Sequence, residues 1–362
     1  MRCKRYLPPE QLELFLSQFE SSKKSTLGFS VQNRPIEMLH IGSGPFKILM
    51  WSQMHGNETT TTKALIDLVP WFLDPNQKKL QNAFTLYIIP QLNPDGSQLY
   101  TRHNANDVDL NRDAIDRSQP ESKVLRTHYD QLQPNLCLNL HGQRTIYSAG
   151  KGGSSASLSF LAPAANPERT ITPARQTAMH HIVAMTKALQ NELPDAIGRY
   201  DDTFNPNCVG DSFTQAGTPT ILFEAGHVPN DYQREKTRAH IFNAFKALFE
   251  SLLKPKKTLK SSDYFMIPQN QVEFCDLIVS QLTILDGENE IKDQKLAIQY
   301  RETLVNGKID FLPVMLAYGS EIEFRAHNYL YLSSSLQSIG LKFEEQKLIK
   351  NTTLAEEFAL KG

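Results

Sequence analysis

Short apolar runs alternate with longer amphipathic stretches through most of the chain, and this alternation predicts its secondary structure. Runs rich in β-branched and aromatic residues predict strands at 46–51, 84–89, 136–140 and 220–223. The spacing of apolar positions predicts helices, which fall at 59–73, 176–193 and 234–253. Nearly continuous apolar strands separated by helices are typical of a sheet covered on both faces. We therefore predict an α/β fold.

The pattern changes after residue 253. Residues 254–262 are basic and polar and predict a linker between a larger domain, 1–253, and an accessory domain, 263–362. In the accessory domain we expect a helix at 271–282, followed by two alternating runs around Asn306-Gly307, a hairpin signal. This indicates a small α+β or β-rich domain. The sequence leaves open whether it packs over an active-site rim, mediates dimerisation or only stabilises the chain.

Composition narrows the class of protein. The 362 residues are 40% hydrophobic and 21% charged, as in folded globular proteins. A formal net charge of −1 argues against a general nucleic-acid binder, and no apolar run is long enough to span a membrane. Four scattered cysteines form no CxxC pair, and no secretory signal is visible, so we expect a reduced, cytoplasmic protein. The oligomeric state stays open.

Candidate metal ligands follow two of the predicted strands. In α/β sheets ligands gather at the carboxyl ends of strands. His55 and Glu58 come after the strand 46–51, and His141 ends the strand 136–140. Two histidines and one glutamate with an open fourth position are the ligand set of a catalytic zinc. Each residue alone is weak evidence for a metal site, because a His-x-x-Glu turn or a capped strand end arises readily by chance.

A further carboxylate, Glu224, emerges from the apolar strand 220–223. A buried carboxylate is costly unless its charge is used, so Glu224 is a metal ligand, a general base or the partner of an arginine. With three ligands already available, the base role fits best. His227, three residues later, fits a structural role better than a contact with the site.

The polar stretch after the second strand supplies candidate anion-binding groups. Asn93-Pro-Asp-Gly96 is a turn by its own chemistry. Arg102 and Arg112 carry guanidinium groups that match carboxylate geometry, so one could hold a substrate carboxylate and the other an oxyanion. The alternative is a loop whose arginines pair with its own aspartates, which are Asp107, Asp109 and Asp113.

These segments together resemble the zinc carboxypeptidase family, over residues 27–253. The resemblance implies a mixed, mostly parallel sheet flanked by helices, and one zinc ion per chain. It implies hydrolysis of a C-terminal peptide or amide bond by a zinc-activated water. Arg102 resembles the arginine that polarises the scissile carbonyl, and Asn111 and Arg112 resemble the pair that binds the terminal carboxylate. The ordered motifs that carry the resemblance are His55-Gly-Asn-Glu58, Asn93-Pro-Asp-Gly96, Arg102, Asp109-Leu-Asn-Arg112, His141 and Glu224.

Three further candidates are Tyr200, Arg144 and Asp211. Tyr200 is the nearest candidate for the tyrosine that closes over the substrate in digestive members of the family. Arg144 would add an anion contact or form a surface ion pair. Asp211 would favour a basic substrate group if it faced inward, but we expect a loop aspartate in an Asx-turn.

Two alternatives remain at this stage. Zinc acylases related to aspartoacylase and succinylglutamate desuccinylase share His-Gly-Asn-Glu and Asp-Leu-Asn-Arg, and would cleave a small N-acyl amino acid. Asn93-Pro-Asp-Gly96 and the spacing to Arg102 favour the peptidase, so the expected partner is a peptide or an N-acyl amino acid with a free carboxylate. The other alternative is a catalytically silent binding protein on the same fold, against which the intact ligand set and base argue.

Overall fold

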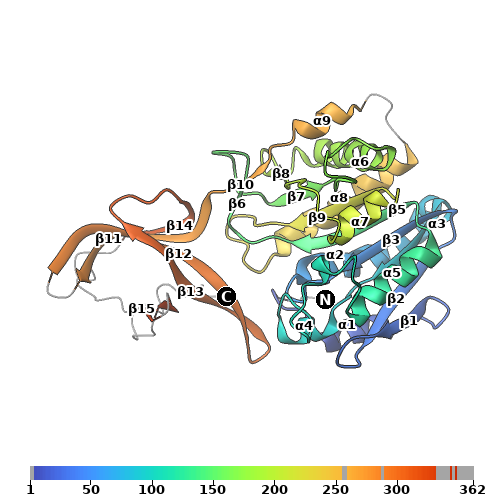
Figure 1. Ribbon diagram of the computed structural model, residues 1–362, viewed down its shortest axis with the longest axis horizontal. Coiled ribbons are helices and arrows are strands. Elements are labelled where there is room, and N and C mark those ends of the chain that lie inside the picture. Colours follow the sequence, from blue (N-terminus) through green and yellow to red (C-terminus); the bar gives the residue numbers. More distant parts are fainter. Residues whose placement is uncertain (1–3, 255–258, 287–288, 332–342, 345–346, 349–362) are drawn as a thin grey trace.

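The larger part of the protein is built around an eight-stranded sheet. The computed structural model describes residues 4–254, 259–286, 289–331, 343–344 and 347–348. The four central strands run parallel, and antiparallel pairs lie toward both edges, so the predicted mixed, mostly parallel sheet is confirmed (Figure 1). In order across the sheet the strands are β1 (Lys24–Phe29), β2 (Pro35–Gly42), β4 (Phe84–Ile89), β3 (Phe46–Ser52), β5 (Leu136–Gly142), β9 (Thr220–Ala225), β7 (Leu158–Leu161) and β8 (Ile197–Arg199).

Helices cover both faces of this sheet. Side chains alternate along β3, so Ile48 and Met50 join a core under α2 (Thr59–Leu73), α6 (Pro173–Leu189) and α8 (Glu235–Leu253). Leu49 and Trp51 point the other way, into a second core under α5 (Pro120–Leu132) and α7 (Val209–Gln215). The remaining short helices of this part are α1 (Pro9–Leu16), η1 (Pro75–Gln77), α3 (Lys78–Ala83), α4 (Pro94–Leu99) and η2 (Leu110–Arg112).

The C-terminal part is a second, β-rich unit that extends away from the sheet (Figure 1). The predicted hairpin is present: Asn306 and Gly307 both have positive φ and join two long antiparallel strands. The strands, in order across this sheet, are β14 (Arg325–Tyr331), β11 (Phe274–Asp286), β12 (Asn289–Val305), β13 (Lys308–Gly319), β16 (Lys347–Leu348) and β15 (Phe343–Glu344).

The helix expected at 271–282 is wrong, because β11 occupies most of that range. Leu277 and Val279 pack into one apolar cluster, whereas Cys275 and Ile278 pack into another. Because apolar residues lie on both faces of this strand, its sequence lacks the two-residue period that distinguishes a strand from a helix, and the polar residues Glu273, Asp276 and Ser280 do not restore that period.

The segment between the two parts packs against the larger part before the chain enters the C-terminal sheet. Of the predicted linker, residues 255–258 lie outside the described residues. The chain then forms α9 (Ser261–Phe265), and Tyr264 is fully buried, with its hydroxyl accepting a hydrogen bond from the Ala162 amide at 3.0 Å. Next β10 (Asn270–Val272) pairs with β6 (Tyr147–Ala149). Among the described helices, none is long and apolar enough to cross a membrane.

Candidate metal centre

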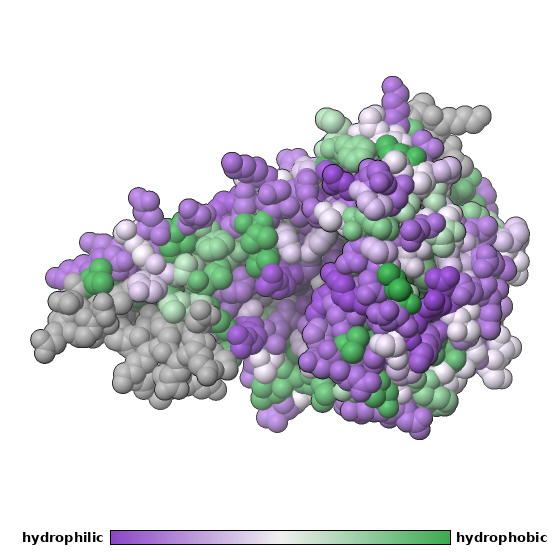
Figure 2. Space-filling model, viewed as in Figure 1, coloured by the Kyte–Doolittle hydropathy of each residue, from purple (hydrophilic) through white to green (hydrophobic). Residues whose placement is uncertain are grey.

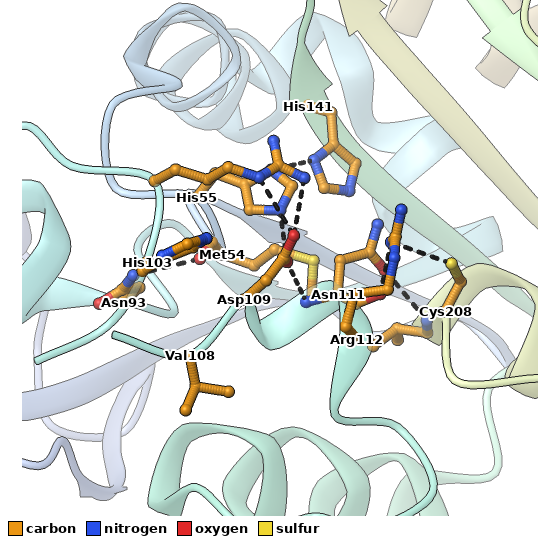
Figure 3. A network of polar contacts seen from close by, with 12 residues as sticks. Met54, His55, Asn93, His103, Val108, Asp109, Asn111, Arg112, His141 and Cys208 are labelled. Atoms are coloured by element: carbon orange, nitrogen blue, oxygen red, sulfur yellow. Dashed lines mark hydrogen bonds and ion pairs between the residues drawn. The ribbon is translucent and has the colours of Figure 1, made fainter. Parts of the chain in front are cut away.

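His55, Glu58 and His141 lie together at the carboxyl ends of two adjacent strands. The Nδ1 atom of His55 lies 2.8 Å from Glu58 Oε1, and the Nδ1 atom of His141 lies 2.9 Å from Glu58 Oε2. The two Nδ1 atoms are 3.1 Å apart (Figure 3). Within the described part of the chain this is the single group of three or more His, Cys, Asp or Glu side chains arranged to hold a metal ion.

The sheet explains why these residues meet. β3 and β5 are parallel neighbours, so the loop after β3 and the end of β5 reach the same edge. Glu58 is the residue before helix α2, and its carboxylate accepts a hydrogen bond from the Gly142 amide at 2.9 Å. Gly56, between the two ligands of this loop, lies against the backbone of Gly96, so closely that a Cβ atom there would overlap it.

The donor set fits a zinc ion. Two imidazole nitrogens and a carboxylate oxygen converge, and zinc accepts these ligand types while leaving a fourth position open. Burial alone would raise the pKa of Glu58, but the two imidazoles outweigh it, and the pKa is lowered. The two imidazole rings beside Glu58 therefore favour the anionic form of its carboxylate.

Asp109 supports this group, a role that the sequence did not assign. Its Oδ1 atom lies 3.0 Å from Nε2 of His55, the ring nitrogen that faces away from Glu58 (Figure 3). A carboxylate on the outer nitrogen fixes the tautomer and orientation of a metal-binding histidine. Asp109 belongs to the Asp-Leu-Asn-Arg motif, so the signal was present, but the sequence suggested it only as the partner of an arginine.

That arginine pairing also exists, and it involves Arg102. The Nε and Nη2 atoms of Arg102 donate to Asp109 Oδ2 at 3.1 and 3.0 Å, and Nη1 lies 3.6 Å from Glu58 Oε1. The side chain of Arg102 is still 45% exposed. Its guanidinium is thus held beside the candidate metal-binding group, His55, Glu58 and His141, while remaining open to a ligand.

Asn111 and Arg112 lie on the other side of Asp109, against helix α7 (Figure 3). The Oδ1 atom of Asn111 accepts a hydrogen bond from the Val209 amide at 3.0 Å. Arg112 donates through Nη1 to its neighbour's carbonyl oxygen at 2.8 Å and to Cys208 Sγ at 3.1 Å. Among the described residues, no carboxylate forms an ion pair with Arg112, so its guanidinium is available to an anion.

Glu224 ends β9, directly beside His141 of β5. It is 9% exposed, and Oε2 finds no hydrogen-bond partner among the described residues. Burial, followed by the nearby charge of Glu58, raises the pKa of Glu224 well above its usual value. A buried carboxylate without a partner is expensive, and here it faces the same cavity as the metal-binding group.

Tyr200 and Arg144 also line this cavity. The hydroxyl of Tyr200 donates to the Tyr147 hydroxyl at 2.9 Å, and burial raises its pKa. The expectation of a loop Asx-turn at Asp211 is wrong, because Asp211 lies in the first turn of α7, is buried and lines the cavity. His227 is buried against Tyr232 and His327, away from the cavity lining.

Comparisons with known proteins show which family part of this chain resembles. Residues 13–159 match the family model described as zinc carboxypeptidase. Carboxypeptidase SOL1 of Arabidopsis thaliana is 29% identical over 165 residues, which cover 38% of this chain and 33% of that protein. Mouse carboxypeptidase M is 28% identical over 179 residues, covering 40% of each. The matched region thus spans between a third and two fifths of these two curated relatives.

Several solved structures are similar in fold to the larger part of this chain. A metallo-carboxypeptidase from Burkholderia cenocepacia aligns with a TM-score of 0.55 at 19% identity, over 68% of this chain and 69% of that one. Bovine thrombin-activatable fibrinolysis inhibitor aligns with a TM-score of 0.54 at 15% identity, over 69% of this chain and 98% of that one. The resemblance expected from the sequence is confirmed over residues 13–159, the part of the chain that is similar to the zinc carboxypeptidase family.

Proposed function

We propose that this protein is a zinc-dependent metallocarboxypeptidase, a hydrolase that removes the C-terminal residue of a peptide. One zinc ion per chain would be held by His55, Glu58 and His141. The observation that carries the proposal is Glu224: a buried carboxylate without a partner that faces the cavity of the metal-binding group. Such a group is costly to the fold and has the position and chemistry of a general base.

A bound zinc ion would supply Lewis acidity, lowering the pKa of a water and polarising a carbonyl group. The protein's own groups account for the rest of the reaction. Glu224 accepts a proton from the attacking water and returns it to the nitrogen of the leaving amine. Arg102, exposed beside Glu58, neutralises the charge that develops on the carbonyl oxygen.

Substrate binding follows from the groups along the cavity. Asn111 and Arg112 bind the terminal carboxylate, because Arg112 has no carboxylate partner among the described residues and Asn111 is fixed to α7. Tyr200 and Arg144 line the same cavity and contact the substrate. The substrate is then a peptide with a free carboxyl end, and removing that carboxylate removes the main ionic contact.

A panel of three substrate types tests the proposal: peptides with a free carboxyl end, the same peptides amidated, and N-acetyl amino acids. We expect amino-acid release from free peptides alone, lost on chelation and restored by zinc. Activity confined to N-acetyl amino acids would identify an acylase instead. Full turnover by a protein that metal analysis shows to be zinc-free would refute the zinc mechanism. Zinc binding without any turnover would indicate a catalytically silent binding protein.

A further inference from the structure

The cavity that holds the metal-binding group does not end within the larger domain. It has a volume of about 980 Å³, and part of its wall comes from the β12–β13 hairpin of the C-terminal domain. In Figure 2 the surface is hollowed where the two parts meet. The lining residues from the hairpin include Tyr300, Glu302, Val314, Met315 and Leu316.

A partly buried ion pair holds the hairpin in this position. Glu302 of β12 accepts a hydrogen bond from Arg5 Nε at 2.9 Å and another from the Tyr100 hydroxyl. Arg5 also donates to the Thr60 hydroxyl at 2.9 Å, in the first turn of α2 and two residues after Glu58. A buried ion pair whose hydrogen bonds are satisfied costs several kcal/mol to break by removing one partner. The hairpin is therefore fixed to the helix that follows a metal-binding residue.

Aromatic contacts also hold the β12–β13 hairpin in place, in addition to the ion pair. Tyr232, just before α8, makes edge-on contacts with Tyr300 at 5.7 Å and Phe311 at 5.5 Å between ring centroids. Its hydroxyl donates to Asp276 of β11 at 3.0 Å. Aromatic pairs of this geometry stabilise contacts beyond the area they bury. The wall is thus part of a packed interface.

The hairpin and the carboxylate-binding groups lie on opposite sides of the metal-binding group. Arg5 joins Glu302 of the hairpin to Thr60 at the start of α2, and Tyr232, just before α8, contacts Tyr300; both helices cover one face of the sheet. Arg112 and Asn111 contact the start of α7, which covers the other face. A substrate whose terminal carboxylate lies at Arg112 has its scissile bond at the metal-binding group. The part of the substrate before that bond must then extend toward the hairpin.

We propose that the β12–β13 hairpin forms the subsite for the residue that precedes the scissile bond, and that this subsite prefers an apolar side chain. The inference rests on the proposed function and names the specificity of the same site. Val314, Met315 and Leu316 of β13 form the apolar part of this wall, whereas β12 also contributes Arg301 and Glu302. Leu316 is 44% exposed although it lines the cavity, so a substrate side chain can cover it.

Four dipeptide substrates test the subsite: acetyl-Leu-Phe, acetyl-Ser-Phe, acetyl-Leu-Lys and acetyl-Ser-Lys. Each pair shares its C-terminal residue, so the ratio of kcat/KM within a pair reports only the preceding residue. We expect ratios of about tenfold or more in favour of leucine, because the free energy gained by burying a leucine side chain corresponds to a kcat/KM ratio of that size. A ratio near one in the wild-type protein overturns the inference.

Leu316→Ser supplies the matched variant, and Tyr318→Ser is its control on the same strand. Tyr318 is 59% exposed and is not among the residues that line the cavity. We expect Leu316→Ser to lower the leucine-to-serine ratio at least threefold and Tyr318→Ser to leave it at the wild-type value. An unchanged ratio in Leu316→Ser, or an equal fall in both variants, overturns the inference. Because Leu316 is exposed, the variant does not disturb a buried core.

The same four substrates separate this inference from the proposed function. Release of phenylalanine or lysine without discrimination between leucine and serine refutes the subsite and leaves the carboxypeptidase intact. Absence of hydrolysis of all four peptides by zinc-loaded protein refutes the proposed function, and the subsite with it. Discrimination that depends on Leu316 supports both.

Discussion

At the scale of single residues, the candidate site includes one group that is costly to bury. Glu224 is buried and has no partner for one carboxylate oxygen among the described residues. A residue of this kind lowers stability, and its position in the cavity indicates that a ligand compensates it. Arg112, in the same cavity, is exposed and forms no ion pair among the described residues.

Glu224→Gln should separate catalysis from metal binding. The substitution keeps the shape of the side chain but removes its ability to accept a proton, so kcat should fall by about 10²–10⁴. Zinc content should stay at one per chain, because Glu224 is outside the metal-binding group. Steady-state kinetics and metal analysis measure both quantities, with the exposed Glu250→Gln as control. Near-full activity in Glu224→Gln would show that another group is the base.

Asp211→Asn should change how stability depends on pH. Burial raises the pKa of Asp211 from 3.8 to about 7, against the lowering effect of its hydrogen bond from the Ala164 amide. The folded protein therefore holds a proton that the unfolded chain has lost between these pH values. The stability that this provides is complete below pH 3.8 and is lost as the pH rises through about 7.

An asparagine has no charge to lose, so Asp211→Asn should gain about 1–3 kcal/mol over wild type at pH 8. Near pH 4.5 the two proteins should have similar free energies of unfolding. Urea unfolding at both pH values measures the difference, and the exposed Asp116→Asn serves as control. The same difference at both pH values would show that Asp211 does not titrate in this range.

At the scale of elements, the loop between β3 and α2 determines the geometry of the metal centre. It carries His55 and Glu58 and packs directly on the backbone of α4. Gly56 is required there because a Cβ atom would lie 2.0 Å from the carbonyl carbon of Gly96. Asn93-Pro-Asp-Gly96, expected to be a turn, is instead the capped start of α4, and it supports this loop.

Gly56→Ala should destabilise the protein by about 3 kcal/mol and weaken zinc binding, because the loop must move away from α4. Thermal unfolding and metal titration measure the two effects. Gly142→Ala is the matched control, since its Cβ would make an ordinary contact of 3.6 Å with Glu58. If the two variants behaved alike, close packing of this loop would not be what holds the site.

Element types were predictable where the pattern had a clear period. The four central strands and helices α2, α6 and α8 follow from the sequence, because their apolar faces repeat with the periods of strand and helix. β11 was missed because both of its faces are buried, which removes that period. The extra strands at the sheet edges were not predicted either, since their burial depends on neighbours that are distant in sequence.

At the scale of the whole molecule, the C-terminal domain shares the cavity with the larger one. The sequence left its role open among packing over the site, dimerisation and stabilisation. The described hairpin packs at the rim of the cavity through Glu302, Tyr300 and Phe311. The boundaries predicted for the two domains remain a prediction, and α9 and β10 pack on the larger domain.

Glu302→Leu should lower the free energy of unfolding by about 3–5 kcal/mol, because it leaves the charge of Arg5 buried without a carboxylate. The double variant Arg5→Met/Glu302→Leu should regain most of that loss, since an apolar pair replaces the ionic one. Chemical denaturation measures both, with the exposed Glu323→Leu as control. A double variant as unstable as the single one would show that the ion pair is not what couples the two domains.

The sequence by itself determined the chemistry at each strand end. His55, Glu58, His141 and Glu224 could be singled out because strands end where the apolar run stops, and polar residues at that point meet at one edge of a sheet. The tertiary structure alone decided which groups support or enclose that chemistry. Asp109 behind His55 and Glu302 against Arg5 are contacts between segments 54 and 297 residues apart, respectively. No local period encodes such contacts, because they form only when the two segments are packed against each other.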